Sequence, residues 1–188
     1  PKKVCVIGAG AIGCEFASLL NDLGSDVRGE GGSQFADTVV KEIRGAGGIA
    51  VANYDSVAEP ESAKAIVQQA LDEFGTLDIL VNNAGILRNR TFKNTSVDDF
   101  QLVVQVHLLG TAYVSHAAWP VMYEKNYGRI VLTTSVSGIF GQFGQSAYGA
   151  AKMGMLGLMN VLALEGRAHG IRVNCLSPGA DTRMTALD

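Results

Sequence analysis

Short β-branched apolar runs alternate with longer amphipathic stretches along the chain, and this alternation constrains the fold more than any other feature. We expect strands where the runs are short and helices where apolar residues recur every three or four positions. The expected strands are Val4–Ile7, 26–30, 49–53, 77–81, Gly128–Thr133 and Ile171–Leu176. The expected helices are 12–23, 34–45, Pro60–Phe74, 97–123 and Ser146–His169. This succession predicts a doubly wound α/β domain whose parallel sheet carries helices on both faces.

The bulk composition fits a single domain spanning residues 1–188, with 47% hydrophobic and 18% charged residues. The net charge is −3 and lysine and arginine do not cluster, so we expect no nucleic-acid partner. No uninterrupted apolar run approaches the ~20 residues of a membrane helix, and the first residues lead straight into a strand. We therefore expect neither membrane attachment nor a signal peptide. Cys5, Cys14 and Cys175 are too widely spaced for a disulfide framework or a metal site, which favours a reducing, cytoplasmic location without a metal.

Glycine and polar residues collect where the expected strands end. In open parallel sheets, ligands bind beyond the carboxyl ends of the strands. The residues that follow these ends are Gly8, Gly10, Asp55, 82–85, Ser135 and 178–182. We therefore expect one binding site along this edge of the sheet.

The sequence GAGAIG at residues 8–13 lies between the first expected strand and helix. Gly8, Gly10 and Gly13 permit a tight turn, and Ile12 opens the helix beside them. Such a turn lets backbone N–H groups approach a pyrophosphate at a helix N-terminus, which is typical of Rossmann-type nucleotide binding.

An acidic residue about 20 positions further on would bind the ribose 2′-hydroxyl and favour NAD(H). Glu30, 17 residues beyond Gly13, is the first candidate and Asp26 the second. Arg28 lies between them and would instead accommodate a 2′-phosphate. NAD(H) is thus the favoured cofactor, and NADP(H) stays open.

Tyr148 and Lys152 lie four residues apart, which places them on one face of the last expected helix. An ammonium beside a phenol favours the phenolate and lowers the phenol pKa from its usual ~10. A phenol tuned in this way can exchange a proton with an alcohol or carbonyl oxygen near neutral pH. Ser135, 13 residues before Tyr148, supplies a hydroxyl at the end of the fifth strand.

These motifs, in this order and spacing, resemble the short-chain dehydrogenase/reductase family. Several stretches resemble one of its subgroups, the (3R)-hydroxyacyl-CoA dehydrogenase module of the peroxisomal D-bifunctional protein and its bacterial relatives. These stretches are 50–57 (AVANYDSV), 82–90 (NNAGILRNR), 106–108 (VHL), 143–145 (FGQ), 164–167 (LEGR) and 183–185 (RMT).

The resemblance implies a role for each matching residue. Tyr148 would protonate the ketone oxygen, Lys152 would lower its pKa and hold the nicotinamide ribose, and Ser135 would stabilise the charge on the substrate oxygen. The expected cofactor contacts are Asp55, Ser56 and Val57 at the adenine, Asn82, Ala84 and Gly85 on the adenosine side, and Pro178, Gly179 and Thr182 over the carboxamide. Thr134 and Ser137 are expected to make only structural hydrogen bonds.

Three features depart from the family pattern. The glycine loop is one residue shorter than the usual TGxxxGxG, and residues 1–27 resemble the NAD-binding segment of flavin-dependent disulfide reductases. His107 occupies the position of a fourth catalytic residue, usually asparagine. Either it fills a helix interface, or its ring holds a water relay near Lys152 and makes the rate more sensitive to pH. Finally, the C-terminal elements that shape the substrate pocket in this family are expected to be missing after Asp188, and the segment 28–33 is short.

The resemblance implies an NAD(P)-dependent oxidoreductase that interconverts a 3-hydroxyacyl and a 3-oxoacyl thioester. The alternatives are a 3-oxoacyl-carrier-protein reductase, a steroid or small-ketone reductase, and a sensor that binds the cofactor without turnover. It also implies a homodimer or homotetramer, formed by the stretches 97–123 and 146–169. The location would be cytoplasmic, or peroxisomal in a eukaryotic multifunctional protein.

Overall fold

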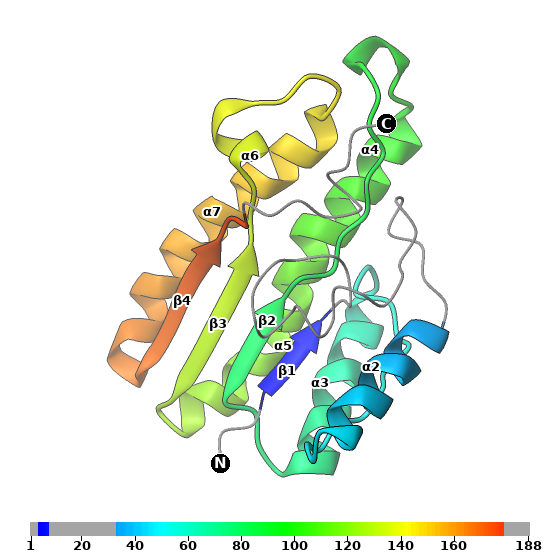
Figure 1. Ribbon diagram of the computed structural model, residues 1–188. Coiled ribbons are helices and arrows are strands. Elements are labelled where there is room, and N and C mark those ends of the chain that lie inside the picture. Colours follow the sequence, from blue (N-terminus) through cyan, green and yellow to red (C-terminus); the bar gives the residue numbers. More distant parts are fainter. Residues whose placement is uncertain (1–3, 8–32, 179–188) are drawn as a thin grey trace.

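In the computed structural model, residues 4–7 and 33–178 are described. Four strands form one parallel sheet in chain order: β1 (Val4–Ile7), β2 (Ile79–Asn82), β3 (Gly128–Thr133) and β4 (Ile171–Leu176) (Figure 1). Asn82, the last residue of β2, pairs with Ile7 on one side and with Leu132 on the other. The parallel α/β fold predicted from the sequence is confirmed.

Helices connect the strands. They are α2 (Ser33–Gly45), α3 (Pro60–Phe74), α4 (Val97–Val104), α5 (Gly110–Glu124), α6 (Val136–Phe140) and α7 (Ser146–Gly166). Two 3₁₀ turns, η1 (Phe92–Asn94) and η3 (Arg167–His169), and a π-helical segment, η2 (Gln105–Leu109), complete them. α5 contacts β2 and β3, α7 contacts β3 and β4, and α3 packs on α5, so these helices form a layer behind the sheet in Figure 1.

The core lies between this helical layer and the sheet. Leu80 on β2 and Ile130 and Leu132 on β3 are fully buried, and Met122 and Met155 cover them from α5 and α7. Burial of each such side chain stabilises the fold by roughly 1.5–3 kcal/mol. The sheet is therefore held rigidly beneath the residues that follow its strands.

Helix α3 has the bounds that the sequence predicts. Pro60 stands in the first turn, where its missing N–H is not needed, and Gly75 ends the helix in the left-handed conformation with φ 73°. The N–H of Gly75 donates to the carbonyl of Leu71. Ile66 and Val67 form part of its buried face.

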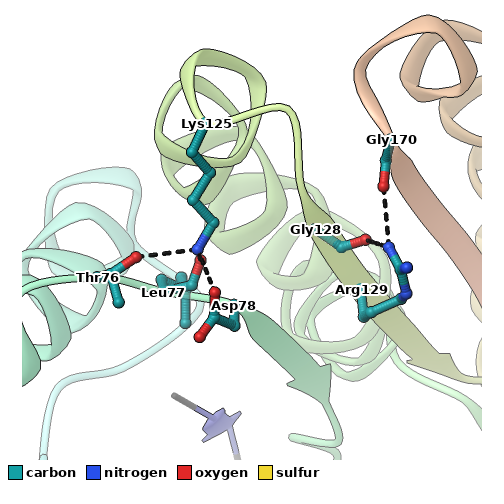
Figure 2. A network of polar contacts seen from close by, with 7 residues as sticks. All are labelled: Thr76, Leu77, Asp78, Lys125, Gly128, Arg129 and Gly170. Carbon is teal, nitrogen blue, oxygen red and sulfur yellow. Dashed lines mark hydrogen bonds and ion pairs between the residues drawn. The ribbon is translucent and has the colours of Figure 1, made fainter. Parts of the chain in front are cut away.

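A lysine ties the end of α5 to the start of β2 (Figure 2). The Nζ of Lys125 donates to Thr76 Oγ1 at 2.9 Å, to the Leu77 carbonyl at 2.6 Å and to Asp78 Oδ1 at 2.5 Å. Asp78 is nearly buried, and the Lys125 ammonium is an ion-pair partner of its carboxylate. The crosslink fixes the end of the sheet opposite to the candidate site.

A second crosslink joins β3 to the turn before β4. Arg129 Nη1 donates to the carbonyl of Gly170 at 2.9 Å and to that of Gly128 at 2.7 Å, as Figure 2 also shows. Its guanidinium lies 4.4 Å from the ring centroid of Tyr127. Both crosslinks thus lie at the amino ends of the strands, away from the carboxyl ends of the sheet.

The predicted strand at 49–53 is wrong, because residues 48–56 form no regular element. Side chains occupy the carbonyls that a neighbouring strand would need. Arg44 Nε donates to the carbonyl of Ala50 at 3.0 Å, and Gln69 Nε2 donates to that of Ala52 at 3.0 Å. The expected elements at 12–23 and 26–30 lie outside the described residues.

Two differences concern helices. The single helix expected at 97–123 consists of α4, the π-helical η2 and α5. The short helix α6 was not expected, since five residues are too few to display a period. It begins directly after Ser135, whose Oγ accepts a hydrogen bond from the Ser137 N–H.

Within the described part of the chain, one stretch, Ser146–His169, is long and apolar enough by length and composition to cross a membrane. We expected no such stretch, because Lys152 interrupts the run of apolar residues. The stretch as a whole is nevertheless apolar on average. About a fifth of its apolar window, 22%, is buried inside the structure. This stretch holds the buried Lys152 and packs on β3, β4, α4 and α6.

Candidate active site

The structure joins Ser135 and Tyr148, which the sequence selects as candidates. Ser135 follows β3 and caps α6, while Tyr148 lies in the first turn of α7. The Ser135 hydroxyl acts on the Tyr148 hydroxyl and has a lowering effect on its pKa, so the two side chains are neighbours. The Ser135 Oγ also lies 3.3 Å from the Ser137 Oγ, and Ser137 donates to Gln142 Oε1 at 3.0 Å. The two candidate hydroxyls therefore lie in one group.

Lys152 is held from two directions by the end of β3. Its Nζ donates to the carbonyl of Thr133, and its own carbonyl accepts a hydrogen bond of 2.8 Å from the Thr134 hydroxyl. The Nζ lies 5.4 Å from the ring centroid of Tyr148. Burial lowers the pKa of Lys152 to about 7, and the neighbouring Cys175 opposes this shift. A lysine with such a pKa can gain or lose a proton at neutral pH.

The pKa of Tyr148 differs from the sequence expectation. Burial raises it above its ordinary value, and the hydrogen bond from Ser135 only partly offsets that effect. The expected lowering by Lys152 is not among the causes of the shift, and the Nζ of Lys152 donates to the Thr133 carbonyl. In this state the phenol is held in its protonated form, ready to donate.

Close packing of α6 on α7 fixes the distance between these groups. Gly138 of α6 faces the α7 backbone, where an added Cβ would lie 2.8 Å from the Met153 nitrogen. Gly149 of α7 faces α6 in turn, since a Cβ there would lie 3.0 Å from the Ser137 carbonyl oxygen. Only glycine at both positions allows this approach.

His107 lies in the π-helical segment η2 and is brought against Tyr148. The two rings are edge to face, with centroids 5.1 Å apart and planes at 89°. The Nε2 lies 2.8 Å from the carbonyl oxygen and 3.1 Å from the nitrogen of Ile86. A π-bulge is often found at a functional site, where it reorients a side chain.

The other ring nitrogen of His107, Nδ1, is buried and has no hydrogen-bond partner among the described residues. Gly85 packs against the His107 ring, since a Cβ added at Gly85 would lie 2.4 Å from the ring Cε1. Burial first, and then the charge of Lys152, lower the pKa of His107 to about 3. The expectation that this histidine makes the rate sensitive to pH near neutrality is therefore wrong, since its ring stays neutral there.

The central strand β2 ends in an asparagine with one free acceptor. Asn82 Nδ2 donates to Ser115 Oγ at 3.1 Å, whereas its Oδ1 is buried without a partner. Asn83 follows, and its Oδ1 accepts a hydrogen bond of 3.4 Å from Thr133 Oγ1. Ala84 packs at the edge of the core. The unsatisfied oxygen at the carboxyl end of the sheet suits a polar cofactor group placed over this edge.

The expected adenine contacts Asp55 and Ser56 lie in the turn before α3. The Asp55 N–H donates to Asn53 Oδ1 at 2.8 Å, and Ser56 Oγ accepts from the Ala58 N–H at 3.2 Å. The segment is fastened to the helix that bears His107, because Gln105 Nε2 donates to the carbonyl of Ala58 at 2.6 Å. Both side chains remain exposed and accessible to a ligand.

Several candidates are not brought into this group. Pro178 is half-buried at the end of the described chain. The remaining candidates lie outside the described residues: Gly8, Gly10, Ile12, Gly13, Glu30, Gly179 and Thr182. Three or more His, Cys, Asp or Glu side chains gathered as for a metal ion are not found at residues 4–7 and 33–178.

Sequence reasoning missed three groups that hold the site. Thr133 and Ile86 act through their backbone atoms, which no residue pattern can reveal. Ser115 reaches Asn82 from α5, 33 residues away in the sequence. Thr134 and Ser137 make structural hydrogen bonds, as expected.

Comparison with known proteins places these features in context. The family model described as short chain dehydrogenase matches residues 2–187. The chain is 51% identical to peroxisomal multifunctional enzyme type 2 of Mus musculus over 98% of its length, which is 26% of the mouse protein. It is also 51% identical to the putative short-chain type dehydrogenase/reductase Rv0148 of Mycobacterium tuberculosis, over 98% of this chain and 68% of that protein.

A solved structure confirms the fold. The crystal structure of a short chain dehydrogenase from Mycobacterium avium superposes with a TM-score of 0.83 and 36% sequence identity, over 99% of this chain and 70% of that chain. The chain thus spans about a quarter of the mouse relative and about two thirds of the mycobacterial proteins. The match covers the strands and helices that hold Ser135, Tyr148 and Lys152.

Proposed function

This chain belongs to the short-chain dehydrogenase family of NAD(P)-dependent oxidoreductases, and on that premise we propose that it interconverts a 3-hydroxyacyl and a 3-oxoacyl thioester. In this proposal Tyr148 exchanges the proton of the reacting oxygen. The observation that carries it is the grouping of the Ser135 and Tyr148 hydroxyls beside the buried Lys152, whose Nζ lies 5.4 Å from the Tyr148 ring centroid.

In the reducing direction, Tyr148 is the acid. Its raised pKa keeps the phenol protonated, so that it can donate to an oxygen that gains negative charge. The Ser135 hydroxyl donates to the same oxygen and stabilises the developing charge. The nicotinamide group, when bound, supplies or accepts the hydride at carbon 3.

Lys152 then limits the charge left on Tyr148. When the phenol has given up its proton, the phenolate lies near an ammonium whose pKa is about 7. The attraction between the ammonium and the phenolate stabilises both charged groups. A proton can also pass from the Lys152 ammonium to the phenolate, which leaves a neutral amine and a neutral phenol. In the oxidising direction the same proton steps run in reverse.

His107 has two possible roles. The bare Nδ1 and the neutral ring fit an acceptor for a water molecule that relays protons toward Lys152. The packing of the ring against Tyr148 and Gly85 fits a purely structural role as well. We propose the relay, because a buried nitrogen without a partner is otherwise unfavourable.

The cofactor would lie along the carboxyl edge of the sheet. We propose that Lys152 and Tyr148 hold its nicotinamide ribose and that Asp55, Ser56 and the segment 82–85 hold its adenosine half. The unsatisfied Asn82 Oδ1 supports this placement. Glu30 makes NAD(H) the favoured cofactor over NADP(H), although it lies outside the described residues. Pro178, Gly179 and Thr182 are proposed to cover the carboxamide.

The substrate class rests on the subgroup resemblance and on the 51% identity to the mouse multifunctional enzyme. We further propose that the protein is a homodimer or homotetramer. We also propose that it works in the cytoplasm, or in the peroxisome if it is part of a eukaryotic multifunctional protein. The mouse relative, peroxisomal multifunctional enzyme type 2, supports the second location.

The test is to measure the oxidation of NADH in the presence of acetoacetyl-CoA. The rate is compared with that obtained with NADPH and with that of the Tyr148→Phe variant. Loss of the proton donor should reduce kcat by about 10²-fold or more, while NADH binding, measured by fluorescence, persists. Tyr113→Phe on α5 is the control for removal of a tyrosine hydroxyl. A preference for NADPH and carrier-protein thioesters would favour the reductase alternative. NADH binding without turnover of any 3-oxoacyl thioester would overturn the proposal.

A further inference from the structure

Two amide side chains, which the proton chemistry proposed above does not use, hold the carboxylate of Asp55. Asn53 Nδ2 donates to Asp55 Oδ2 at 2.9 Å and to Gln69 Oε1 at 2.6 Å. Asn53 Oδ1 accepts a hydrogen bond of 2.8 Å from the Asp55 N–H. Asn53 and Gln69, here called the amide pair, are half-buried, whereas Asp55 is exposed. The amide pair thus links the first buried turns of α3 to an exposed carboxylate.

The hydrogen bonds fix the orientation of both amides. Gln69 Nε2 donates to the carbonyl of Ala52 at 3.0 Å, which leaves Gln69 Oε1 to accept from Asn53. Asn53 Oδ1 is occupied by the Asp55 N–H, so the two hydrogens of its Nδ2 serve Gln69 and Asp55. Exchange of oxygen and nitrogen in either amide would break these bonds. The amide pair therefore presents one fixed donor to the Asp55 carboxylate.

The segment that bears these groups is braced on two sides. The Tyr54 hydroxyl donates to Asp37 Oδ1 of α2 at 2.5 Å. On the other side, Gln105 Nε2 donates to the carbonyl of Ala58 at 2.6 Å, which fastens the turn to η2, the segment that bears His107. The turn that carries Asp55 is thus fixed relative to the candidate active site.

One carboxylate oxygen of Asp55 is left for a ligand. Its Oδ2 is bound by Asn53, and its Oδ1 has no hydrogen-bond partner within residues 4–7 and 33–178. An ionised carboxylate accepts hydrogen bonds and donates none. The exocyclic amino group of adenine is a donor, whereas hypoxanthine carries a carbonyl oxygen at the same carbon. A fixed carboxylate at this position therefore suits adenine and opposes hypoxanthine.

We propose that Asn53 and Gln69 are positioning residues that hold the Asp55 carboxylate for the amino group of adenine, so that the protein selects adenine over hypoxanthine in its dinucleotide cofactor. The inference rests on the proposed function, which puts Asp55 at the adenine, and deepens it by naming the residues that set base selectivity. An exposed aspartate that rotates freely gives up this freedom when it binds a ligand. Asn53 restricts the rotation beforehand, so less affinity is lost when adenine binds.

The experiment measures the dissociation constants of NADH and of reduced nicotinamide hypoxanthine dinucleotide by the fluorescence of the reduced nicotinamide. The wild type should bind NADH about tenfold more tightly, as expected for one hydrogen bond to a charged group. Asn53→Ala and Gln69→Leu should each lower this ratio to about three, because the carboxylate then rotates freely. Gln68→Leu is the matched control, since Gln68 lies beside Gln69 on α3 but donates to Asp72 at 2.8 Å. It should keep the wild-type ratio.

A double variant separates positioning from support of the fold. In the Asp55→Ala background the ratio should be about one, and adding Asn53→Ala should leave it unchanged, because the amide pair acts through the carboxylate. If Asn53→Ala weakens the binding of both dinucleotides equally and keeps the wild-type ratio, Asn53 only supports the turn and the inference is overturned. A wild-type ratio near one would overturn it as well.

The proposed function can fail independently of this inference. The same proteins are assayed with acetoacetyl-CoA and each dinucleotide. Selective binding of NADH without turnover of any 3-oxoacyl thioester overturns the proposed function and supports the role of the amide pair. Turnover with equal affinity for both dinucleotides overturns the inference alone.

Discussion

The ring of His107 stands edge-on to the ring of Tyr148, with centroids 5.1 Å apart and planes at 89°. This contact brings a residue of the π-helical η2 to Tyr148 of α7, the proposed proton donor. The ring of His107 is tied to the Ile86 backbone at 2.8 Å. Its neutral state is thus enforced by burial, and this has a measurable consequence.

We predict that His107 makes the fold sensitive to acid. Its pKa is about 3 in the folded protein and 6.5 when unfolded, so below pH 6.5 the unfolded state binds a proton that the folded state refuses. Stability therefore falls as the pH drops from 6.5 toward 3, by about 2 kcal/mol at pH 5. Between pH 8 and pH 5 the wild type should lose about 2 kcal/mol more stability in urea unfolding than His107→Asn, because Lys152 and the other titrating groups are common to both proteins.

The control is His116→Asn, which removes an exposed imidazole from α5. It should retain the wild-type difference between pH 8 and pH 5. If His107→Asn and the wild type lose the same stability over this interval, the ring is not held neutral by burial. The activity of His107→Asn, measured at pH 7.5, separately reports on the proposed relay.

Gly85→Ala should displace the His107 ring. The added Cβ would lie 2.4 Å from the ring Cε1, far below van der Waals contact, so the ring or the backbone must move. We expect a loss of 1–3 kcal/mol in stability and a fall in kcat of about tenfold. Chemical denaturation and steady-state kinetics measure the two effects.

Two further variants isolate this clash. Gly157→Ala on the exposed side of α7 meets no atom within 4 Å and should stabilise the helix by roughly 0.5–1 kcal/mol. The double variant Gly85→Ala/His107→Asn should be more stable than the two single effects predict, because the shorter side chain makes room. Additive losses would mean that Gly85 is required for a reason other than the ring.

The sequence predicts the helices and strands whose bounds are set by signals within their own residues. α3 begins at Pro60 and ends before Gly75 because both signals are local, and β3 and β4 place apolar residues at alternating buried positions. The strand expected at 49–53 is not formed, and side chains distant in the sequence, Arg44 and Gln69, bond to two of its carbonyls.

The candidate site divides in the same way. The spacing of Tyr148 and Lys152 brings them to one helical face, and the sequence identifies that pair. It does not reveal that Lys152 donates to a Thr133 carbonyl, or that burial raises the pKa of Tyr148. Burial sets the pKa values here, and burial depends on residues distant in the sequence.

Lys125 should stabilise the fold without affecting catalysis. Lys125→Met removes the ammonium from the nearly buried Asp78, and such a loss destabilises by about 2 kcal/mol, given that Lys125 itself is partly exposed. kcat/KM should stay within about twofold, because Asp78 precedes β2 whereas the site follows it. Thermal or urea unfolding and the acetoacetyl-CoA assay check both statements.

The exposed pair Lys64–Glu61 is the matched control for this ion pair. Lys64→Met should change stability by no more than about 0.5 kcal/mol. Asp78→Asn in the Lys125→Met background should restore part of the loss, since it removes the carboxylate that lacks its ammonium. A Lys125→Met protein as stable as the wild type would show that the crosslink in Figure 2 contributes nothing.

Lys152 should reveal its lowered pKa through the stability of the protein. The pKa is about 7 when folded and 10.5 when unfolded, so between these values the unfolded state holds a proton that the folded state has lost. The contribution of Lys152 to the free energy of unfolding therefore rises with pH between pH 7 and pH 10.5. Below pH 7 Lys152 is charged in the folded protein, and the full cost of burying its ammonium lowers the stability. From pH 6 to pH 9 the wild type should gain about 2–3 kcal/mol relative to Lys152→Met.

One neighbour has to be removed from this measurement. Burial raises the pKa of Cys175 above 9.0, which opposes the effect of Lys152 at the alkaline end, and the two groups interact. Both proteins are therefore compared as Cys175→Ser variants, and the groups common to them cancel in the difference. Urea unfolding at pH 6, 7.5 and 9 then isolates Lys152. Parallel pH dependences would mean that Lys152 remains protonated throughout, and it would then serve the Tyr148 phenolate only as a fixed charge, not as a source of protons.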